Sequence, residues 1–330
     1  MTERVTMADV ARVAGVSSAT VSYVLSGKRP VAPETRAAVE AAIADLSFTI
    51  NATARSLRTG RSSLVALIVP DIANPFFAQL AATLDEELRG LGLHVVVCNT
   101  RARRAEEQAL LAEATQQRFA GVVITPFRLK PNDFEPIVGA GIPVVVSADV
   151  SFGPIDLVTP DAGNAIRRAL EEVAAAGRRR IAMIAGPRDA TGGDPRLEQL
   201  RALALQFGMS LPRELVVRGE HARQAGAAGF GELMSRRYRP DAIFCGNDVI
   251  AIGAMDKANE LGVNIPADVA LIGHDDASFA SLVRPQLTTI RYPAAGVGRA
   301  AAQLLIERLN GRQVHKTVHI KAEFVARSSV

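Results

Sequence analysis

The N-terminal fold is decided by residues 5–43, which read VTMADVARVAGVSSATVSYVLSGKRPVAPETRAAVEAAI. Thr6 precedes Asp9 by three residues, which is the spacing of a helix capping box. This pattern predicts a first helix over about residues 7–14 and a tight turn at Gly15, because glycine accepts the left-handed backbone that ends many helices. The side chains expected to face inward from this helix are Val10, Val13 and Ala14.

A second short helix, SATVSYVLS, follows the turn, and Ser17 stands at its N-cap position. A third helix is expected to begin at Pro33, because proline is favoured in the first turn of a helix. Together they form a helix-turn-helix, whose second helix is the expected recognition helix. Its outward side chains are short or hydrogen-bonding, as a helix entering the major groove requires: Ser18, Ala19, Ser22 and Tyr23. The small core is expected to contain Val21, Val24, Leu25, Val39, Ala42, Ile43 and Leu46.

Composition indicates a globular protein. A chain of 330 residues, 48% hydrophobic and 22% charged, fits a small module joined to a larger two-lobed domain. No apolar run reaches about 18 residues and the start is not that of a signal peptide, so we expect a cytoplasmic protein with no membrane span. Residues 1–61 hold eight Lys or Arg against five Asp or Glu, so most of the net charge of +4 lies with the helix-turn-helix. Cys98 and Cys245 stand in apolar runs and are expected to be buried, reduced thiols.

From residue 64 onward, apolar runs typical of strands alternate with amphipathic helices. The first set contains LVALIV, LHVVVC, GVVIT and PVVVS. A second set begins near Leu157 and contains RIAMIAG, ELVVRG, DAIFCGN and VALIGHD. This alternation predicts an α/β domain of two similar lobes, each with buried parallel strands.

Polar side chains follow many of these strands, at the sheet edge where ligands bind in open parallel sheets. They are Asp71, Asn74, Thr125 and Asp149 in the first lobe, and Asn247, Asp248 and Asp275 in the second. Facing carboxylates and amides suit bidentate hydrogen bonds to vicinal hydroxyl groups, and Phe76 offers an apolar face for a sugar ring. The sequence therefore predicts a neutral polyol as the ligand. The alternative is that Asp71 and Asp248 only cap the helices that follow them.

No motif for catalysis, nucleotide binding or metal binding stands out. The glycines of GPRDATGGD and AAGVGR form neither a G-x-G-x-x-G nor a Walker loop, and there is no G-x-S-x-G. His315 and His319 are four residues apart, but KTVHI reads as a strand, in which four residues span about 13 Å, too far to share a metal ion. We expect no enzyme activity, no cofactor and no metal site.

Residues 5–43 resemble the DNA-binding headpiece of the lactose-repressor (LacI) family. The resemblance continues through SLVALIVPDIANPFFAQL, GPRDATGGDPRLEQL, AIFCGNDVIAIGAM and LIGHDDASFASLVRPQLTTI to EFVARSSV at the C-terminus. It implies a periplasmic-binding-protein-like fold for the two-lobed domain. It also implies a transcriptional repressor that binds double-stranded operator DNA and responds to a small-molecule effector.

The resemblance implies which residues contact DNA. Ser18, Ala19, Ser22 and Tyr23 match base-reading positions, whereas Thr6, Asn51 and the turn after Ser26 match positions near phosphates or sugars. Ser17, Thr20 and Ala54 belong to the same implied surface. Leu57 matches the leucine of a hinge helix that opens the central base step from the minor groove. Tyr23 stands where the family usually has arginine, which removes a contact to guanine and puts the operator sequence in doubt. Ala32 stands where the family usually has serine, which removes a side-chain cap from the third helix.

The resemblance also adds two effector residues and a mechanism. Arg196 matches an arginine that holds effector hydroxyls or carboxylates, and His221 falls where the family often has an aromatic lid and would bring pH sensitivity. Effector is expected to close the lobes, unpair the hinge helices of a two-fold homodimer and release the operator. The expected dimer contacts are the helix near residues 77–88 and the region around Ala280. The sequence shows no C-terminal leucine heptad, so a tetramer is not expected.

Of two other functions, a transport protein is disfavoured and a corepressor-dependent regulator stays open. A solute-binding transport protein would share the two-lobed fold, but it would need a signal peptide and no headpiece. A regulator that requires a corepressor, such as a purine, a phosphorylated metabolite or a partner protein, is not excluded. The scarcity of stacking aromatics, with no Trp and three Tyr, favours a sugar.

These patterns divide the chain into a headpiece at 1–49, a hinge helix and linker at 50–62, and an effector-binding and dimerisation domain at 63–330. The first lobe is expected to contain about 63–160 and 293–320. The second is expected to contain about 161–292 and 321–330.

Overall fold

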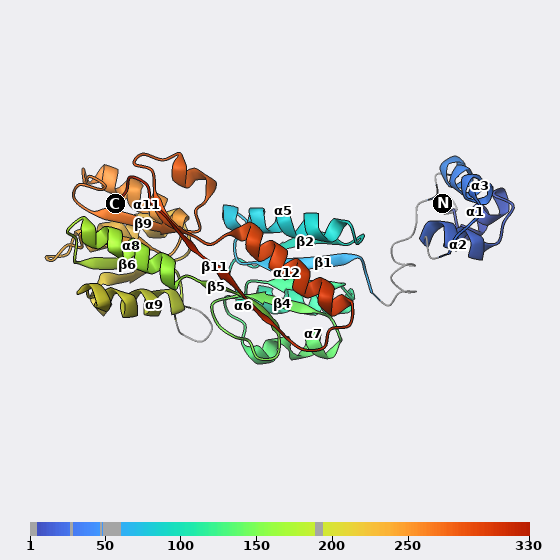
Figure 1. The fold of residues 1–330 in the computed structure, drawn as a ribbon, viewed down its shortest axis with the longest axis horizontal. Helices are drawn as coiled ribbons and strands as arrows, with labels where there is room; N and C mark the ends of the chain where they lie inside the picture. The colour runs from blue at the N-terminus through green and yellow to red at the C-terminus, as the bar shows by residue number, and fades with distance from the viewer. Residues whose placement is uncertain (1–4, 27–28, 47, 49–60, 189–193) are drawn as a thin grey trace. The chain divides into compact units, whose positions relative to one another are not determined.

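The chain forms two compact units, Met1–Ser62 and Ser63–Val330 (Figure 1). The computed structural model describes residues 5–26, 29–46, 48, 61–188 and 194–330. Within these residues no helix has both the length and the apolar character needed to cross a membrane.

The first unit is a helix-turn-helix with a third helix packed against it. Its helices are α1 (Met7–Val13), α2 (Ser18–Ser26) and α3 (Pro33–Asp45). The predicted capping box is confirmed, because Thr6 accepts a hydrogen bond from the Asp9 amide and the Asp9 carboxylate accepts one from the Thr6 amide. Gly15 has the left-handed φ of +64° that the turn into α2 requires. The Ser17 hydroxyl accepts from the Thr20 amide at 3.1 Å, so the predicted cap of α2 is also present.

The small core of this unit differs from the prediction at one position. Its buried members are Val10, Ala11, Val21, Val24, Val39 and Ala42. Val13 was expected to face inward, but its side chain is 47% exposed, because Ala11 takes the inward position in this one short helix. The predicted Leu25, Ile43 and Leu46 pack against the core while half-buried. Ala32 provides no side-chain cap to α3, because alanine has no polar side-chain atom to accept a hydrogen bond.

The second unit has two lobes, each built on a six-stranded sheet. Lobe one has the strand order β11-β5-β4-β3-β1-β2 and is parallel throughout. Its strands are β1 (Leu64–Val69), β2 (His94–Asn99), β3 (Gly121–Ile124), β4 (Val144–Ser147), β5 (Asp156–Asp161) and β11 (Thr317–Lys321). Helices α5 (Pro75–Arg89) and α12 (Ala294–Leu309) cover one face, and α6 (Arg104–Gln116) and α7 (Glu135–Gly139) cover the other. The buried valines and isoleucines of β1, β3 and β4 explain why these runs form central strands.

Lobe two has the strand order β12-β10-β9-β8-β6-β7, with only β12 antiparallel to its neighbour among the paired strands of the described chain. Its strands are β6 (Ile181–Ala185), β7 (Val216–Arg218), β8 (Ala242–Cys245), β9 (Ala270–His274), β10 (Thr288–Arg291) and β12 (Glu323–Val325). Helices α8 (Gly163–Ala175) and α9 (Pro195–Ala204) cover one face, and α10 (Arg223–Met234) and α11 (Asp248–Glu260) the other. Short 3-10 turns lie at Pro131–Phe134, Leu205–Phe207, Arg213–Leu215 and Ser278–Ser281.

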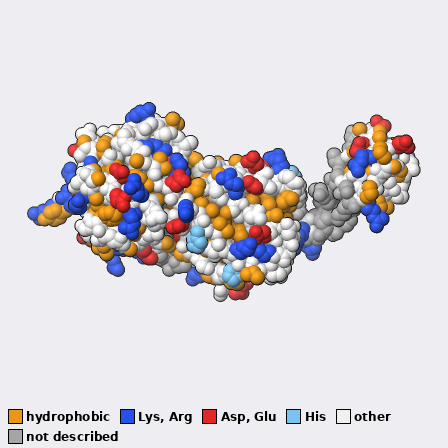
Figure 2. Space-filling model, viewed as in Figure 1, with side chains coloured by type: hydrophobic (Ala, Val, Ile, Leu, Met, Phe, Trp, Pro, Cys, Tyr) orange, Lys and Arg blue, Asp and Glu red, His pale blue; other side chains and the backbone are white. Residues whose placement is uncertain are grey.

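The chain passes between the lobes three times, after β5, after β10 and after β11. The passages after β5 and after β11 lie side by side, because β5 and β11 are neighbouring parallel strands, and both run toward lobe two in Figure 1. The carboxyl ends of the parallel strands of both sheets therefore face one shared region. On the surface in view, basic and acidic side chains are interspersed over the second unit rather than gathered by sign (Figure 2).

The cysteines lie on strands, as their apolar surroundings predicted. Cys245 on β8 is buried, but Cys98 on β2 is only half-buried, which corrects its expected burial. The physical reason is that β2 is an edge strand of lobe one.

Candidate effector site and DNA-binding face

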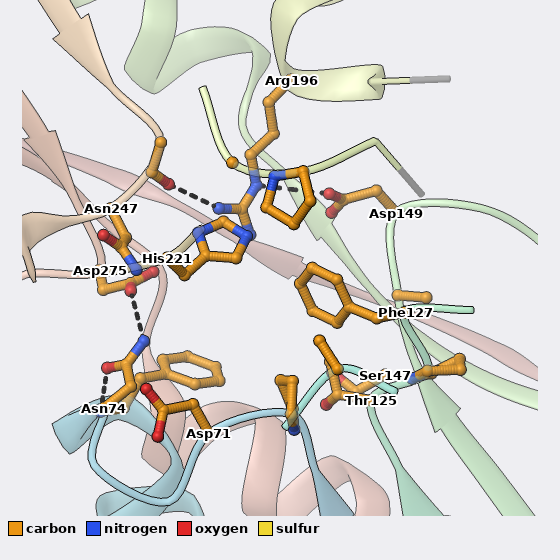
Figure 3. Close-up of a pocket in the computed structure, with 18 of the residues that line it drawn as sticks. Asp71, Asn74, Thr125, Phe127, Ser147, Asp149, Arg196, His221, Asn247 and Asp275 are labelled. Atoms are coloured by element: carbon orange, nitrogen blue, oxygen red, sulfur yellow. Dashed lines mark hydrogen bonds and ion pairs between the residues drawn. The ribbon is translucent and has the colours of Figure 1, made fainter. Parts of the chain in front are cut away.

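A cavity of about 370 Å³ lies between the two lobes, at the carboxyl ends of their parallel strands. Loops after β1, β2, β3 and β4 supply one wall, and loops after β6, β7, β8 and β9 supply the other. Nine predicted effector residues line it: Asp71, Asn74, Phe76, Thr125, Asp149, Arg196, His221, Asn247 and Asp275. Figure 3 labels all of these residues except Phe76 and shows the labelled side chains around this space. The cavity is of a size that suits a small organic ligand.

Arg196 links the two walls. It lies in the first turn of α9, and its Nε is 3.3 Å from Asp149 Oδ2 across the cleft. Its Nη1 donates to the carbonyl oxygen of Gly246, in its own lobe, at 3.1 Å (Figure 3). Burial alone would lower the pKa of Arg196, but the carboxylates of Asp149 and Asp275 raise it, so the guanidinium is charged. The positively charged guanidinium of Arg196 is thus held within the site, with some of its N–H donors directed at the cavity.

Asp275 is the most constrained acid in the site. Its backbone has a φ of 106°, a conformation that side chains other than glycine rarely adopt and that concentrates at functional positions. Asn74 donates to Asp275 Oδ2 at 3.3 Å, and His274 Nδ1 lies 3.0 Å from Asp275 Oδ1. Burial would raise the pKa of Asp275, but the hydrogen bond with His274 and the charge of Arg196 outweigh it, so the pKa is lowered. The carboxylate is therefore ionised and fixed in place.

Two buried polar atoms on facing walls have no hydrogen-bond partner within the described chain. They are Thr125 Oγ1, after β3 in lobe one, and His221 Nδ1, after β7 in lobe two. Burial, followed by the charge of Arg196, lowers the pKa of His221 to about 4, so the ring is neutral near pH 7. This corrects the pH sensitivity expected of His221 in the physiological range. A buried polar atom without a partner costs about 1–3 kcal/mol, which a bound hydroxyl group would recover.

Aromatic rings supply the apolar part of the lining. Phe76 stacks on Tyr292 with a centroid distance of 5.6 Å and an interplanar angle of 15°. Phe127 meets the His221 ring edge-on at 5.3 Å. The predicted apolar face of Phe76 is thus held by Tyr292, and His221 completes an aromatic pair rather than forming a lid alone. Such faces suit the C–H surface of a sugar ring.

Carboxylates outnumber cations around the cavity. The lining contains the acids Asp71, Asp149, Asp194, Glu220 and Asp275 and the bases Arg101 and Arg196. Asp194 is paired with Arg218 at 2.9 Å, and Asp149 with Arg196. The balance disfavours an anionic ligand, because an added phosphate would lie near several like charges.

Asp248 does not reach the cavity, which corrects its expected effector contact. It is 1% exposed, and its carboxylate accepts from the Ala277 amide and the Thr289 hydroxyl, each at 2.7 Å. Burial, with the nearby charge of Asp275, raises the pKa of Asp248 to about 8. The reason is its position in the first turn of α11, one residue after the Asn247 cap, from which its carboxylate is bound by Ala277 and Thr289.

Sequence reasoning missed several lining residues. They include Arg101, Phe127, Asp194, Glu220 and Tyr292. Arg101 follows β2, so the strand-end rule that found its neighbours would have found it too, whereas the rule selects polar residues and could not have found Phe127 after β3. Asp71 and the two asparagines also have local structural roles: Asp71 accepts from Ala73 at 3.0 Å, and Asn74 and Asn247 cap α5 and α11.

The predicted DNA-contacting residues divide into three groups. Thr6, Ser17 and Thr20 take part in the helix caps of α1 and α2. Ser18 and Ala19 are exposed on α2, and Ser22 and Tyr23 are half-buried on it. Asn51, Ala54 and Leu57 lie outside the described residues, so their hinge roles stay predictions.

Comparison with known proteins decides the family. Residues 6–51 match the bacterial regulatory proteins of the lacI family, and residues 170–330 match the periplasmic binding protein-like domain. The chain is 31% identical over 333 residues to the HTH-type transcriptional repressor PurR of Proteus mirabilis, which covers 98% of this chain and 96% of that protein. The chain belongs to the LacI family. It is therefore a DNA-binding transcriptional repressor with an effector domain, and the family is not one of enzymes.

Two further family members extend the similarity over nearly the whole chain. The ribose operon repressor of Escherichia coli (strain K12) is 32% identical over 308 residues, which is 92% of this chain and 93% of that protein. A crystal structure of the Lac repressor dimer bound to operator and the anti-inducer ONPF superposes with a TM-score of 0.86 at 26% identity, covering 99% of each chain. The two-lobed α/β architecture next to an N-terminal helix-turn-helix is the arrangement of the family.

Proposed function

We propose that the chain binds its operator as a homodimer and releases it when a neutral, hydroxyl-rich sugar occupies the cavity between the lobes. The observation that carries this proposal is the pair of unpartnered buried atoms, Thr125 Oγ1 and His221 Nδ1, on facing walls of the cavity. A hydroxyl group both donates and accepts hydrogen bonds, as do the Thr125 hydroxyl and a neutral imidazole. A polyol can therefore satisfy both walls at once.

The charges around the cavity support a neutral sugar. Asp149 and Asp275 offer carboxylate oxygens that accept from neighbouring hydroxyl groups, and Arg196 offers donors to the same ligand. Phe76 and Phe127 add apolar surface for the ring. The similarity to a ribose operon repressor agrees with this ligand class. A purine or a phosphorylated metabolite fits less well, because the lining is mostly acidic.

Three contacts that cross between the lobes connect sugar binding to the relative position of the lobes. They are the ion pair of Arg196 with Asp149, the hydrogen bond from Asn74 to Asp275, and the bond from Arg128 Nη1 to the Arg188 carbonyl at 3.1 Å. The groups of the first two contacts line the cavity, so a sugar that inserts among them changes the relative position of the lobes. To move the operator from nearly all bound to nearly all free, it must discriminate the two states by about 5 kcal/mol.

The remaining parts follow the expectations from sequence. The headpiece at 1–49 reads the operator, the hinge at 50–62 orders on DNA with Leu57 at the base step, and 63–330 senses the sugar and dimerises. A dimer through α5 and the region around Ala280 presents two headpieces to a two-fold operator, and the Lac repressor of the comparison is a dimer on its operator. Operator DNA places the protein in the cytoplasm.

Operator release in the presence of sugars tests the proposal. The full-length protein first selects its site from duplexes taken from next to its own gene, at one fixed salt concentration. Titration of the complex with ribose, glucose, cellobiose, ribose 5-phosphate, hypoxanthine and guanine then shows which compounds act. We expect at least one unphosphorylated sugar to weaken operator binding by a factor of ten or more. Tightening by a purine or by a phosphorylated sugar alone would overturn the sugar assignment.

The hinge is tested separately with Leu57→Ala. We expect this variant to lose both affinity and DNA bending, because the leucine wedge is removed while the headpiece is intact. A variant that bound and bent the operator normally would remove the hinge from the mechanism and leave the sugar site unaffected.

A further inference from the structure

One buried acid lies behind the lobe-one wall of the cavity without reaching it. Glu107, on α6, is 0% exposed and is not among the residues that line the cavity. Its Oε1 accepts a hydrogen bond from the amide of Phe127 at 2.7 Å, and its Oε2 accepts one from the amide of Arg128 at 3.0 Å. Both oxygens of one carboxylate thus hold two successive amides of the segment that follows β3.

This segment, the bridging loop (residues 125–129), reaches lobe two at two points. The ring of Phe127, which also lines the cavity, meets the ring of His221 edge-on at 5.3 Å (Figure 3). Arg128 Nη1 donates to the carbonyl oxygen of Arg188 at 3.1 Å. The lining of the cavity and the contact between the lobes therefore depend on the same short loop.

The position of Glu107 makes sense only through this loop. Phe127 and Arg128 lie between the end of β3 and the 3-10 turn at Pro131–Phe134, so their amides belong to no helix or sheet ladder and need another acceptor. A buried carboxylate is unfavourable unless it receives hydrogen bonds. Burial raises the pKa of Glu107, and the amides of the loop oppose that rise. Acid and loop therefore satisfy each other.

We propose that Glu107 is a positioning residue for operator release: by holding the bridging loop on α6, it makes lobe one follow lobe two when the sugar binds. This inference rests on the proposed function. A loop fixed to α6 passes a displacement of Phe127 and Arg128 to the body of lobe one, whereas a loose loop bends instead. Glu107 acts only through these two residues, because it is buried outside the cavity.

Asp133 provides a matched control. Its carboxylate also joins α6 to the chain after β3, because it accepts from Arg104 and Gln108 of α6 at 2.9 and 2.8 Å and from the Lys130 amide at 2.6 Å. Lys130 lies beyond the bridging loop, and neither it nor Asp133 lines the cavity. Glu107→Gln and Asp133→Asn each replace a carboxylate by an amide between the same two segments, so only the part of the chain that is held differs.

Operator affinity with and without saturating sugar tests the positioning role. The sugar is whichever of ribose, glucose and cellobiose releases the full-length parent, and thermal unfolding confirms that each variant is folded. Without sugar, Glu107→Gln should bind the operator within about threefold of the parent, because headpiece and hinge are unchanged. A glutamine has one acceptor oxygen for the two amides, so the factor by which saturating sugar weakens operator binding should fall by about fivefold.

The control should behave differently. Asp133→Asn should retain this release factor within about twofold of the parent, because the bridging loop keeps its acceptor. A release factor in Glu107→Gln equal to that of the parent would overturn the inference. An equal fall in Glu107→Gln and Asp133→Asn would also overturn it, because the effect would then be general damage to lobe one.

Removal of both contacts with lobe two separates positioning from other effects of the substitution. With Phe127→Ala and Arg128→Ala combined, the loop no longer meets lobe two through these side chains. Glu107→Gln should then have almost no further effect on the release factor. The same fall in both backgrounds would show that Glu107 acts independently of the loop and would overturn the positioning role.

Hydrogen exchange gives a readout that needs no sugar. Glu107→Gln should speed the exchange of the Phe127 and Arg128 amides about tenfold, and Asp133→Asn should leave both within about twofold of the parent. Unchanged exchange in Glu107→Gln would overturn the inference at its first step. A parent that no sugar releases would instead overturn the proposed function and, with it, the role in release, even if the exchange changed as expected.

Discussion

The two walls of the cavity are built differently. In lobe two, Asp275 is 9% exposed, its backbone is strained, and its Oδ1 lies 3.0 Å from Nδ1 of His274 in the same lobe, whereas the bond from Asn74 to its Oδ2 crosses from lobe one. In lobe one, Asp149 also follows a strand, but its side chain is 25% exposed and it forms an ion pair with Arg196 of the opposite lobe. Lobe two is therefore a preorganised surface for the sugar, and lobe one contributes groups whose positions depend on how the lobes meet. Affinity should come mainly from lobe two and the conformational response from lobe one.

Arg196 should show the largest effect, because it belongs to one wall and pairs with the other. Arg196→Ala leaves the carboxylates of Asp149 and Asp275 without their shared cation, so sugar affinity should fall by about 100-fold, or roughly 3 kcal/mol. Isothermal titration calorimetry with the sugar that releases the operator measures this loss. Arg237→Ala is the control for an exposed arginine. An Arg196→Ala protein with unchanged sugar affinity would remove the link between the walls.

Asp275 and Asp248 provide a matched pair within lobe two. Asp275→Asn removes an ionised acceptor from the cavity and should weaken sugar binding by about tenfold or more. Asp248→Asn changes a residue outside the cavity, and its amide can still accept from Ala277 and donate to Thr289, so sugar affinity should stay within about twofold. Equal losses in the two variants would show that the cavity wall has been assigned incorrectly.

Thr125 tests the wall of lobe one. Thr125→Val keeps the shape of the side chain and removes its unpartnered hydroxyl. Sugar affinity should fall by about fivefold, or roughly 1 kcal/mol, while the free protein should be equally or more stable, because a buried polar atom without a partner is gone. Calorimetry and thermal unfolding measure the two quantities. A destabilised protein with unchanged sugar affinity would assign the hydroxyl a structural role.

The smallest expected effect is the pH dependence that His221 brings. Its folded pKa of about 4 lies below the unfolded value of about 6.5, so the unfolded chain takes up the proton first as the pH falls. The contribution of neutral His221 to the free energy of unfolding is fully present above pH 6.5 and is lost toward pH 4. Between pH 7 and pH 5.5 the loss amounts to about 1 kcal/mol. Unfolding of the parent and of His221→Gln across this range measures the difference. Sugar affinity should be constant from pH 8 to pH 6, and a fall within that range would contradict a neutral His221.

The sequence predicted features that depend on neighbouring residues. The caps at Thr6 and Ser17 need only a few adjacent positions, and the strand-end rule depends on a local apolar run followed by a polar residue. These signals predicted the architecture and six residues that line the cavity, and the resemblance to the LacI family added Arg196 and His221.

What the sequence did not predict depends on contacts between distant residues. The strand-end rule could not separate Asp248 from Asp275, because the difference lies in the bonds of Asp248 to the distant residues Ala277 and Thr289, which hold its carboxylate away from the cavity. Stacking of Phe76 on Tyr292 joins residues far apart in the chain, and Arg29 on Tyr23 joins a loop to a helix across two turns. The exposure of Val13 was missed because one short helix buries only a narrow stripe.

Reciprocity between sugar and DNA tests the central claim most directly. The affinity of the releasing sugar is measured for the free protein and for the protein saturated with its operator, at the same salt concentration and pH. If the sugar shifts one equilibrium between lobe arrangements, it should bind the operator complex more weakly, by the same factor by which it weakens operator binding. Equal sugar affinities for the two states, or tighter binding to the operator complex, would contradict release through the cavity.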